Sequence, residues 1–182
     1  MTLQKLPLEK SFMFLESGPV LLVTTRVGRK NNVMTISWHM VLDFTPLLAL
    51  KTGPWNYSFA ALLEQRECVL CVPAVDLAEK TVRIGAISGE KVDKLKKFGL
   101  NVKKAETVKP PLLEDCLFCL ECRVVDYIEA YGIIVLEGKQ AWYNTAKDNK
   151  QTFHANGDGT FIVDGKILNY RNIMKDKIPP GV

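Results

Sequence analysis

The sequence predicts a mainly β fold with short helices, in which an antiparallel β-barrel carries helical insertions. Short apolar runs rich in β-branched residues recur along the chain, and turns rich in glycine, proline and asparagine separate them. Only a few short helical segments lie between these runs, a pattern that favours a closed antiparallel barrel over a doubly wound sheet.

Length and composition predict a single domain and exclude several function classes. The chain has 182 residues, and we expect a core over about residues 18–143 followed by a C-terminal hairpin and tail over 144–182. The net charge of +4 is modest, and no aromatic residues alternate with basic ones, so we expect no nucleic-acid partner. No apolar run is long enough for a membrane span, and the N-terminal residues do not resemble a signal peptide. Five cysteines without secretion signals favour a reducing cytoplasm.

The organising element is a hairpin near the N-terminus. Residues 19–25 form an almost entirely apolar run that is typical of a strand buried on both faces. Residues 26–31 are a polar turn, and residues 32–38 predict the returning strand. The alternation places Thr35 and Ser37 on one face of this strand, and on the other Met34, Ile36 and Trp38.

The rest of this half predicts an ordered series of short elements. Residues 8–17 fit either a short helix or an extended arm. After them we expect a strand over 40–51, a turn over 52–58, a helix over 59–67 capped by Asn56 or Ser58, and a buried strand over 68–73.

The second half predicts two helices followed by long strands. Asp76 and Glu79 have the spacing of a capping box, which would open a helix ending near Gly85. Ser88 would cap a second helix over 89–98, with Gly99 as its stop. We then expect a loop over 101–114, strands over 116–127 and 131–143, and hairpin turns at 156–157, 158–159 and 164–165.

The cysteine spacing invites a metal site but does not fit one. Residues three apart on a strand point to opposite faces, so Cys119 is expected to face away from Cys116 and Cys122. Buried thiols acting as small hydrophobes are the favoured interpretation, and a cysteine-ligated metal protein stays as an alternative.

Residues 156–160 lack the terminal glutamate of a calcium loop. No nucleophile elbow, Walker loop or dinucleotide fingerprint is present, so no catalytic residue is assigned.

Three polar segments remain as candidates for ligand binding: residues 32–37, residues 51–58, and Ser88-Gly89 with Lys94. Ser58 and Ser88 are expected at helix N-termini, where backbone N–H groups and the helix dipole favour a phosphate. Trp55 and Tyr57 have the chemistry to pack beside a planar ring. Ordinary helix caps and a surface loop are the alternative interpretation of each segment by itself.

These segments carry a family resemblance. The run Asn32-Val-Met-Thr-Ile-Ser-Trp38 resembles the flavin-binding edge of the flavin reductase-like, FMN-binding split-barrel proteins, especially the flavoredoxins. Two further stretches resemble the same family in the same order, namely 45–58 with its proline and its aromatic and hydroxyl groups, and 88–94 with its Ser-Gly and Asp-Lys pairs. The resemblance implies a split antiparallel barrel of Greek-key type, a homodimer, and FMN bound near the subunit interface.

The resemblance also implies a set of FMN-binding residues. Residues 34–37 would line the ring and ribityl chain, residues 51–58 would hold the phosphate, and the 88–94 segment would close the site from the same or the partner subunit. The implied set is Asn32, Met34, Thr35, Ile36, Ser37, Lys51, Thr52, Trp55, Tyr57, Ser58, Ser88, Gly89 and Lys94.

The sequence departs from the family at positions that bear on the electron donor. Ala130-Tyr131 stands where many members have an Asp-His pair tied to nicotinamide handling, and Leu136 replaces a glycine. The usual arginine before Ser58 is missing, and Lys51 is the nearest cation. These differences leave open whether NAD(P)H is used.

We therefore expect an FMN-binding oxidoreductase that passes electrons through its flavin, with Met34, Ile36 and Trp38 as an apolar wall that excludes water from one side of the ring. Its partners would be FMN, a second copy of the chain, and NAD(P)H or a redox protein. The alternatives are an FMN electron carrier that takes electrons from a protein rather than from NAD(P)H, and a barrel without cofactor that serves binding or assembly.

Overall fold

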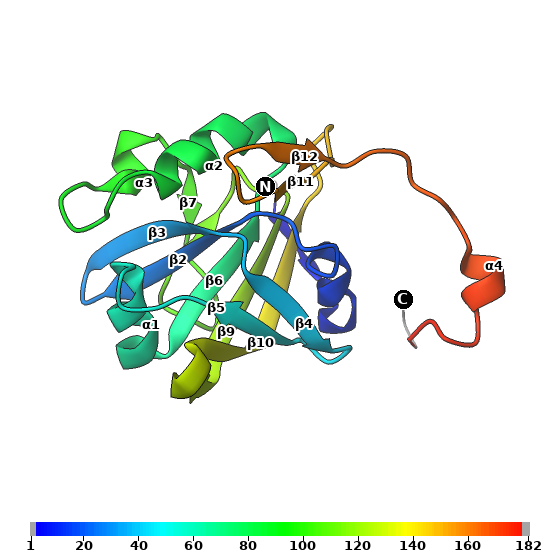
Figure 1. Cartoon of the computed structure of the whole chain (residues 1–182), viewed down its shortest axis with the longest axis horizontal. Helices are drawn as coiled ribbons and strands as arrows, with labels where there is room; N and C mark the ends of the chain where they lie inside the picture. Colours follow the sequence, from blue (N-terminus) through cyan, green and yellow to red (C-terminus); the bar gives the residue numbers. More distant parts are fainter. Residues whose placement is uncertain (1–2, 180–182) are drawn as a thin grey trace.

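The computed structural model describes residues 3–179, and its main feature is one curled antiparallel sheet of eight strands (Figure 1). The strand order is β3-β2-β6-β9-β10-β5-β4, and β1 adds to β10. The two edge strands, β3 (Lys30–Ile36) and β4 (His39–Asp43), follow each other in sequence and are separated only by residues 37–38. The sheet therefore curls until its edges meet at one corner. The predicted antiparallel barrel is confirmed, in a split rather than a closed form.

The remaining elements join or cover this barrel. The other strands of the sheet are β1 (Leu3–Leu6), β2 (Leu21–Val27), β5 (Leu47–Lys51), β6 (Glu67–Val72), β9 (Phe118–Ile128) and β10 (Ile133–Asn144). Two small ladders lie outside it: β7 (Val102–Lys103) with β8 (Leu112–Leu113), and β11 (Phe153–Ala155) with β12 (Phe161–Val163). The α-helices are α1 (Ser58–Gln65), α2 (Ala78–Gly85), α3 (Lys94–Lys97) and α4 (Arg171–Met174). Short 3₁₀ turns are η1 (Leu8–Phe14), η2 (Val75–Leu77) and η3 (Glu129–Tyr131).

Apolar side chains pack on both faces of the sheet. Alternate residues of β2 show this directly: Leu21 and Val23 belong to the cluster inside the barrel, whereas Leu22 belongs to the cluster beneath the outer layer that includes α2. The prediction of a strand buried on both faces is thus confirmed for β2. None of the helices within residues 3–179 has the length and apolar character that crossing a membrane requires.

The cysteines pair across two central strands. In the β6–β9 ladder Cys68 lies opposite Cys122 and Cys71 opposite Cys119, with 3.4 Å between the sulfur atoms of the second pair. All five thiols are free and buried. Burial is the largest cause that raises the pKa of the thiols of Cys71, Cys119 and Cys122. These sulfurs are packed as small apolar groups.

The expected orientation of the cysteines is confirmed in one case and wrong in another. Cys119 and Cys122 pack on opposite sides of the sheet, as strand alternation predicts. Cys116 nevertheless shares the outer cluster with Cys119. It precedes the first residue of β9, Phe118, so the alternation of that strand does not govern its direction.

Both predicted helix starts after residue 75 are wrong. Asp76 does not cap α2; its carboxylate forms an ion pair with Lys147 at 2.6 Å, and the helix begins at Ala78 after a 3₁₀ turn. Ser88 is not a cap either, because α3 begins at Lys94 and its capping side chain is Asp93, which accepts from the Lys96 N–H at 3.0 Å. The predicted ends at Gly85 and Gly99 are confirmed.

Three segments differ from their predicted form. Residues 40–51 form not one strand but a hairpin of β4 and β5 around residues 44–46. The predicted loop over 101–114 carries the small β7–β8 ladder. Asp164-Gly165 is not a hairpin turn, because the chain leaves the β11–β12 hairpin there as an extended segment that stands off the barrel (Figure 1). The turn over 156–160 does join β11 to β12, as predicted.

Candidate functional site

A polar cavity of about 310 Å³ opens beside edge strand β3. Three segments that are far apart in sequence form its lining: the middle of β3, the turn before α1, and the loop from the end of α2 to α3. The lining residues are Asn32, Met34, Thr35, Trp55, Asn56, Tyr57, Gly85, Ala86, Ile87, Ser88, Gly89 and Lys94. The volume lies at the lower end of the range of about 300–1,000 Å³ that is usual for ligand sites.

Edge strand β3 presents groups from both of its faces. Asn32 is buried, and its amide nitrogen donates to the hydroxyl of Ser58 at 2.8 Å, which ties the strand to the start of α1. The hydroxyl of Thr35 points the other way and donates to the carbonyl of Thr81 in α2 at 2.7 Å. Because no further strand pairs beyond β3 in the sheet order, side chains of both faces reach the same cavity.

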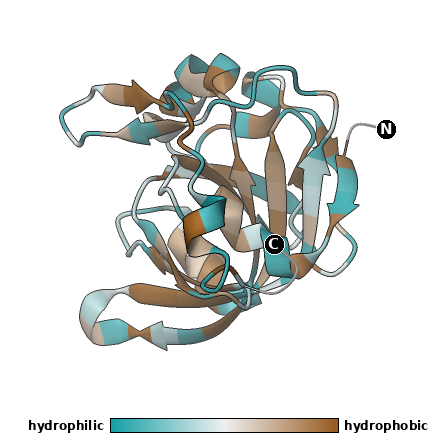
Figure 2. Cartoon of the chain, turned by 90° about the vertical axis from the view of Figure 1, so that its right-hand side faces the viewer, coloured by the Kyte–Doolittle hydropathy of each residue, from teal (hydrophilic) through white to brown (hydrophobic). Residues whose placement is uncertain are grey.

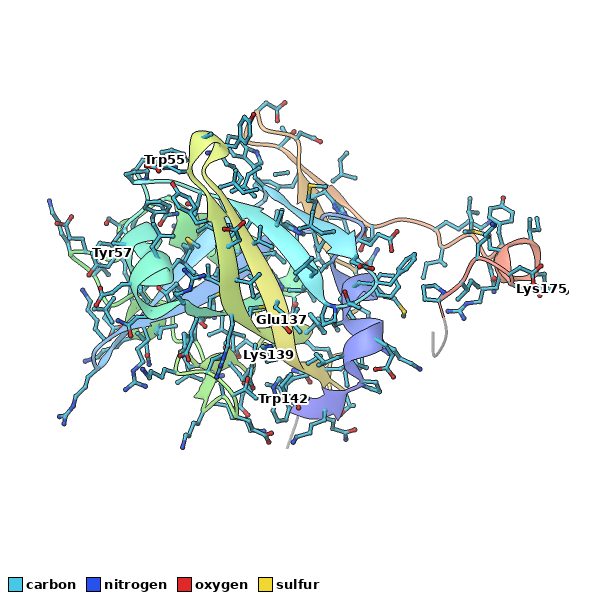
Figure 3. All side chains as sticks on the ribbon, turned by 90° about the horizontal axis from the view of Figure 1, so that it is seen from below. Trp55, Tyr57, Glu137, Lys139, Trp142 and Lys175 are labelled. Carbon is cyan, nitrogen blue, oxygen red and sulfur yellow. The ribbon has the colours of Figure 1, made fainter. Side chains whose placement is uncertain are left out.

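The turn before α1 supplies two aromatic rings. Trp55 is 71 % exposed and lies against the backbone of Gly53, where a β-carbon would collide with its ring. The ammonium of Lys51 lies 5.0 Å from the centre of the same ring, a cation–π contact. Asn56 accepts from the N–H of Ser58 at 3.0 Å and so fixes the chain where α1 begins. Figure 3 shows Trp55 and Tyr57 on the same side of the molecule.

The loop after α2 approaches β3 closely because it carries glycines. A β-carbon at Gly89 would collide with the side-chain amide of Asn32, and one at Gly85 would lie 3.1 Å from the β-carbon of Thr35. The ammonium of Lys30 donates to the carbonyl of Gly89 at 3.0 Å and of Glu90 at 3.3 Å. Lys30, which belongs to β3, therefore holds this loop against the strand.

The electrostatic character of the cavity is positive. Lys94 is buried, and its ammonium donates to the carbonyl of Ile84 at 2.9 Å. Burial lowers the pKa of Lys94, because removal from water disfavours the charged form. Lys30 and Lys51 contact the lining residues Tyr57 and Trp55 from outside the cavity. No carboxylate is found among the lining residues of the described chain.

The structure brings together eight of the thirteen predicted site residues in the cavity lining. These are Asn32, Met34, Thr35, Trp55, Tyr57, Ser88, Gly89 and Lys94. Two others contact lining residues without lining the cavity themselves. Ser58 accepts a hydrogen bond from Asn32, and the Lys51 ammonium lies over the ring of Trp55. The remaining three do not line it. Thr52 is buried, and its hydroxyl has no hydrogen-bond partner among residues 3–179. Ile36 packs against the barrel core, and Ser37 is exposed beyond the end of β3.

Of the predicted apolar wall only Met34 lines the cavity, because Ile36 packs against the barrel core. Trp38 is 65 % exposed and is not part of the cavity lining. It follows β3 in the two-residue link to β4, where the chain leaves one edge of the sheet for the other. Met34 packs in the barrel core and also lines the cavity.

Sequence reasoning missed the residues that assemble the site. Lys30 was placed in a turn, yet it holds the loop 59 residues away against β3. Residues 85–87 also line the cavity, whereas Asn56 lies within the predicted segment 51–58. The Ser-Gly pair at 88–89 was a usable signal for the loop. No local pattern in the sequence marks the partner of Lys30.

The residues present fit a phosphorylated, planar ligand such as FMN. Two glycines keep the loop backbone against β3 without a side chain between them, so main-chain groups border the cavity. Lys94 and the neighbouring Lys30 and Lys51 match a phosphate in charge, and the two aromatic rings match a flat ring in shape.

Comparison with known proteins shows the family and the fold. The family model described as a flavin reductase-like domain matches residues 13–167. An uncharacterized protein of Archaeoglobus fulgidus is 37 % identical over 101 residues, which cover 55 % of this chain and only 57 % of that relative. The uncharacterized protein YddH of Escherichia coli is 26 % identical over 172 residues, with 84 % and 89 % of the two chains covered.

Solved structures share the fold. An FMN-binding domain of a flavin reductases-like enzyme from Shewanella baltica superimposes with a TM-score of 0.84 at 24 % identity, over 92 % of this chain and 96 % of that one. A flavoredoxin from Methanosarcina acetivorans gives 0.73 at 25 % identity, over 83 % and 87 %. Since the family model covers most of the chain, from the first 3₁₀ turn to beyond the last hairpin, the protein belongs to the flavin reductase-like domain family.

Proposed function

We propose that this protein binds FMN in the cavity beside β3 and works as a redox protein of the flavin reductase-like and flavoredoxin type. The observation that carries the proposal is the convergence of three hydroxyl-, glycine- and lysine-bearing segments on one cavity. Bound FMN supplies the redox chemistry, since it accepts electrons from one partner and passes them to another.

The chain's own residues bind and orient the cofactor in this proposal. The turn over 51–58, whose residues 55–57 line the cavity, holds the phosphate beside the start of α1, where the helix dipole favours an anion. Lys94 adds positive charge from a buried position, which strengthens its attraction for an anion. Met34 and Trp55 border the ring and keep water from part of its surface. No side chain is assigned as an acid, base or nucleophile.

The proposal also includes a homodimer and a cytoplasmic location. The family resemblance supports the first, because it implies FMN near a subunit interface. The five free, buried thiols support the second, because a reducing compartment keeps cysteines unpaired.

FMN binding is tested by titrating the purified, flavin-free protein with FMN and following the quenching of flavin fluorescence. We expect saturable binding, and at least a tenfold higher Kd in Trp55→Leu. Ile162→Ala is the control, because Ile162 is 57 % exposed but lies outside the cavity. Protein that stays colourless and shows no saturable quenching would overturn the proposal and select the barrel without cofactor.

A second candidate is an FMN carrier that receives electrons from a protein instead of NAD(P)H. It is favoured by Tyr131, which stands where the family resemblance implies a histidine and is 68 % exposed. The next residue, Gly132, packs against the ammonium of Lys51, which in turn lies over Trp55, so this substitution is at the border of the site. Mixing the FMN-loaded protein with NADH and with NADPH without oxygen separates the two: bleaching of the flavin selects a reductase, and persistent colour selects a carrier.

A further inference from the structure

The segment after the last hairpin stands away from the barrel as an arm (Figure 1). This C-terminal arm, residues 165–179, includes the single-turn helix α4. Residues 165–177 are all exposed, and within the described part of the chain every hydrogen bond of the arm joins two of its own residues. A four-residue helix is not stable by itself in water, so the arm needs a partner surface to keep this form.

The arm carries many apolar side chains, although segments that are exposed to water are usually polar. Five large side chains face water, with exposed fractions from 52 % to 91 %: Ile167, Leu168, Tyr170, Ile173 and Met174. Four basic residues, Lys166, Arg171, Lys175 and Lys177, accompany them against one acidic residue, Asp176. Figure 2 views the molecule from the side of the arm and shows hydrophobic and hydrophilic segments next to each other on it. Apolar groups flanked by positive charge are typical of a segment that docks in an acidic-rimmed apolar groove.

The barrel carries a surface with the complementary properties. Trp38, Met40, Leu42 and Phe44, which we call the apolar stripe, are 65 %, 58 %, 43 % and 56 % exposed and follow edge strand β4. The last three line a groove of about 420 Å³ together with Phe12, Glu16 and Asp43. The groove thus has apolar walls and two carboxylates, and the strand beside it has an unpaired edge.

The arm leaves the barrel from a fixed point. At the base of the arm, Asp164 accepts from the N–H and the hydroxyl of Thr152 at 2.7 and 2.6 Å, and it pairs with His154 at 2.7 Å. The arm is therefore anchored at its base, while its own side chains and those of the groove both remain exposed within one chain. In Figure 3, Lys175 of the arm lies on the opposite side of the molecule from Trp55 and Tyr57.

We propose that two copies of this chain exchange their arms, with the C-terminal arm of each copy docked along the apolar stripe and groove of the other. The contact is self-complementary, because a two-fold axis makes both arms engage at once and closes the assembly as a dimer. Apolar residues of the arm cover the stripe, and its lysines and arginine face Glu16 and Asp43. The inference holds whatever the cavity beside β3 binds.

Sedimentation of the full chain tests this interface. We expect the unmodified protein at twice its mass of 20.4 kDa. Ile167→Glu with Ile173→Glu in the arm, or Met40→Glu with Leu42→Glu in the stripe, should raise the dimer dissociation constant at least tenfold. All four side chains are exposed within one chain, so the variants should fold, as circular dichroism will show. The matched control, Val102→Glu with Val125→Glu, is exposed elsewhere and should stay dimeric.

A crosslinking experiment decides which surfaces meet. One chain carries Ile173→Cys and another Met40→Cys, and glutathione disulfide is the oxidant: it is reduced to two glutathione molecules as the two introduced thiols form one disulfide. We expect a linked heterodimer only when both chains are mixed. A monomeric unmodified protein, an arm variant with unchanged dissociation constant, or a bond formed within a single chain carrying both cysteines would each overturn the proposal. A monomeric protein would also overturn the homodimer of the proposed function, whereas the other two outcomes would overturn the arm exchange alone. FMN binding itself is measured separately by the titration.

Discussion

At the scale of single residues, the cavity depends on the absence of a side chain at Gly89. The loop after α2 lies so close to β3 that a β-carbon at this position would collide with the side chain of Asn32. Asn32 in turn holds the hydroxyl of Ser58 at 2.8 Å. One backbone position therefore controls the distance between all three segments of the site.

Gly89→Ala should disturb binding more than folding. The added methyl group displaces Asn32 and breaks its bond to Ser58, so the FMN dissociation constant should rise about tenfold, or ~1.4 kcal/mol. The free energy of unfolding should fall by only ~1 kcal/mol, the worth of one hydrogen bond. Fluorescence titration and urea denaturation measure the two effects.

The matched control for this substitution is Gly165→Ala. Gly165 lies in the arm, and a β-carbon there meets nothing within 4 Å. It should leave both quantities unchanged. If Gly89→Ala bound FMN as tightly as the original protein, the close approach of loop and strand would have no role in the site.

At the scale of elements, the β11–β12 hairpin is attached to the barrel through charged and polar contacts. His154 contacts the carbonyl of Gly18 at 3.1 Å and the carboxylate of Asp164 at 2.7 Å. Partial burial acts to raise the pKa of Asp164, but the hydrogen bonds from Thr152 and His154 outweigh it, and the net pKa lies below its usual value. The ionised carboxylate is thus the form that the hairpin stabilises.

This attachment should weaken in acid. Because the pKa of Asp164 is lower in the folded than in the unfolded chain, its contribution is complete above the unfolded value of ~3.9 and is lost as pH falls through the folded value. The protection factors of the amides of residues 153–163, which compare their exchange rates with those of an unfolded chain at the same pH, should therefore fall at low pH. In Asp164→Asn the same amides should already be less protected at pH 7, and their protection should depend much less on pH. Equal exchange rates in both proteins at pH 7 would contradict the prediction.

Strands were easier to predict than the starts of helices, and the reason is the range of the interactions. Most residues of β2 are apolar or β-branched, so a short window of sequence is enough to predict this buried strand. The capping-box pattern at Asp76 and Glu79 was a sound local signal, but Asp76 instead pairs with Lys147, 71 residues away. A side chain that could cap a helix can instead bind a residue far away in the sequence, and a local sequence pattern does not reveal that partner.

At the scale of the whole molecule, a buried carboxylate attaches the outer layer to the barrel. Glu121 on β9 is fully buried and accepts from the N–H groups of Glu106 and Thr107, from the Thr107 hydroxyl, and from the indole of Trp142 at 2.7 Å. The Glu121 carboxylate thus accepts hydrogen bonds from both the 104–109 loop and β10.

Glu121→Ala should be strongly destabilising, by about 3 kcal/mol or more, because several buried donors lose a charged acceptor. Glu137→Ala on β10 is the control. Its pair with Lys139 is partly exposed, so its loss should change stability by less than ~1 kcal/mol. Figure 3 shows Glu137 and Lys139 next to each other. Urea denaturation of both variants measures the difference, and similar midpoints would contradict the assigned role of Glu121.

The whole fold explains which parts of the site were accessible to sequence reasoning. The three segments carry their own hydroxyls, glycines and aromatic rings, so each could be selected before its neighbours were known. Trp38 lies outside the cavity because β3 ends at Ile36, and strand alternation does not continue into the link between the two sheet edges. Lys30 was missed because its partners lie on a loop that folding alone brings to it.

The paired thiols of β6 and β9 have a consequence for how the protein can be studied. They occupy the two central strands and are shielded from solvent on both sides, so an alkylating reagent reaches them only when the barrel opens. The labelling rate of the native protein therefore reports the frequency of that opening, without an introduced cysteine. A cofactor that stabilises the closed barrel would slow the labelling in proportion to its occupancy.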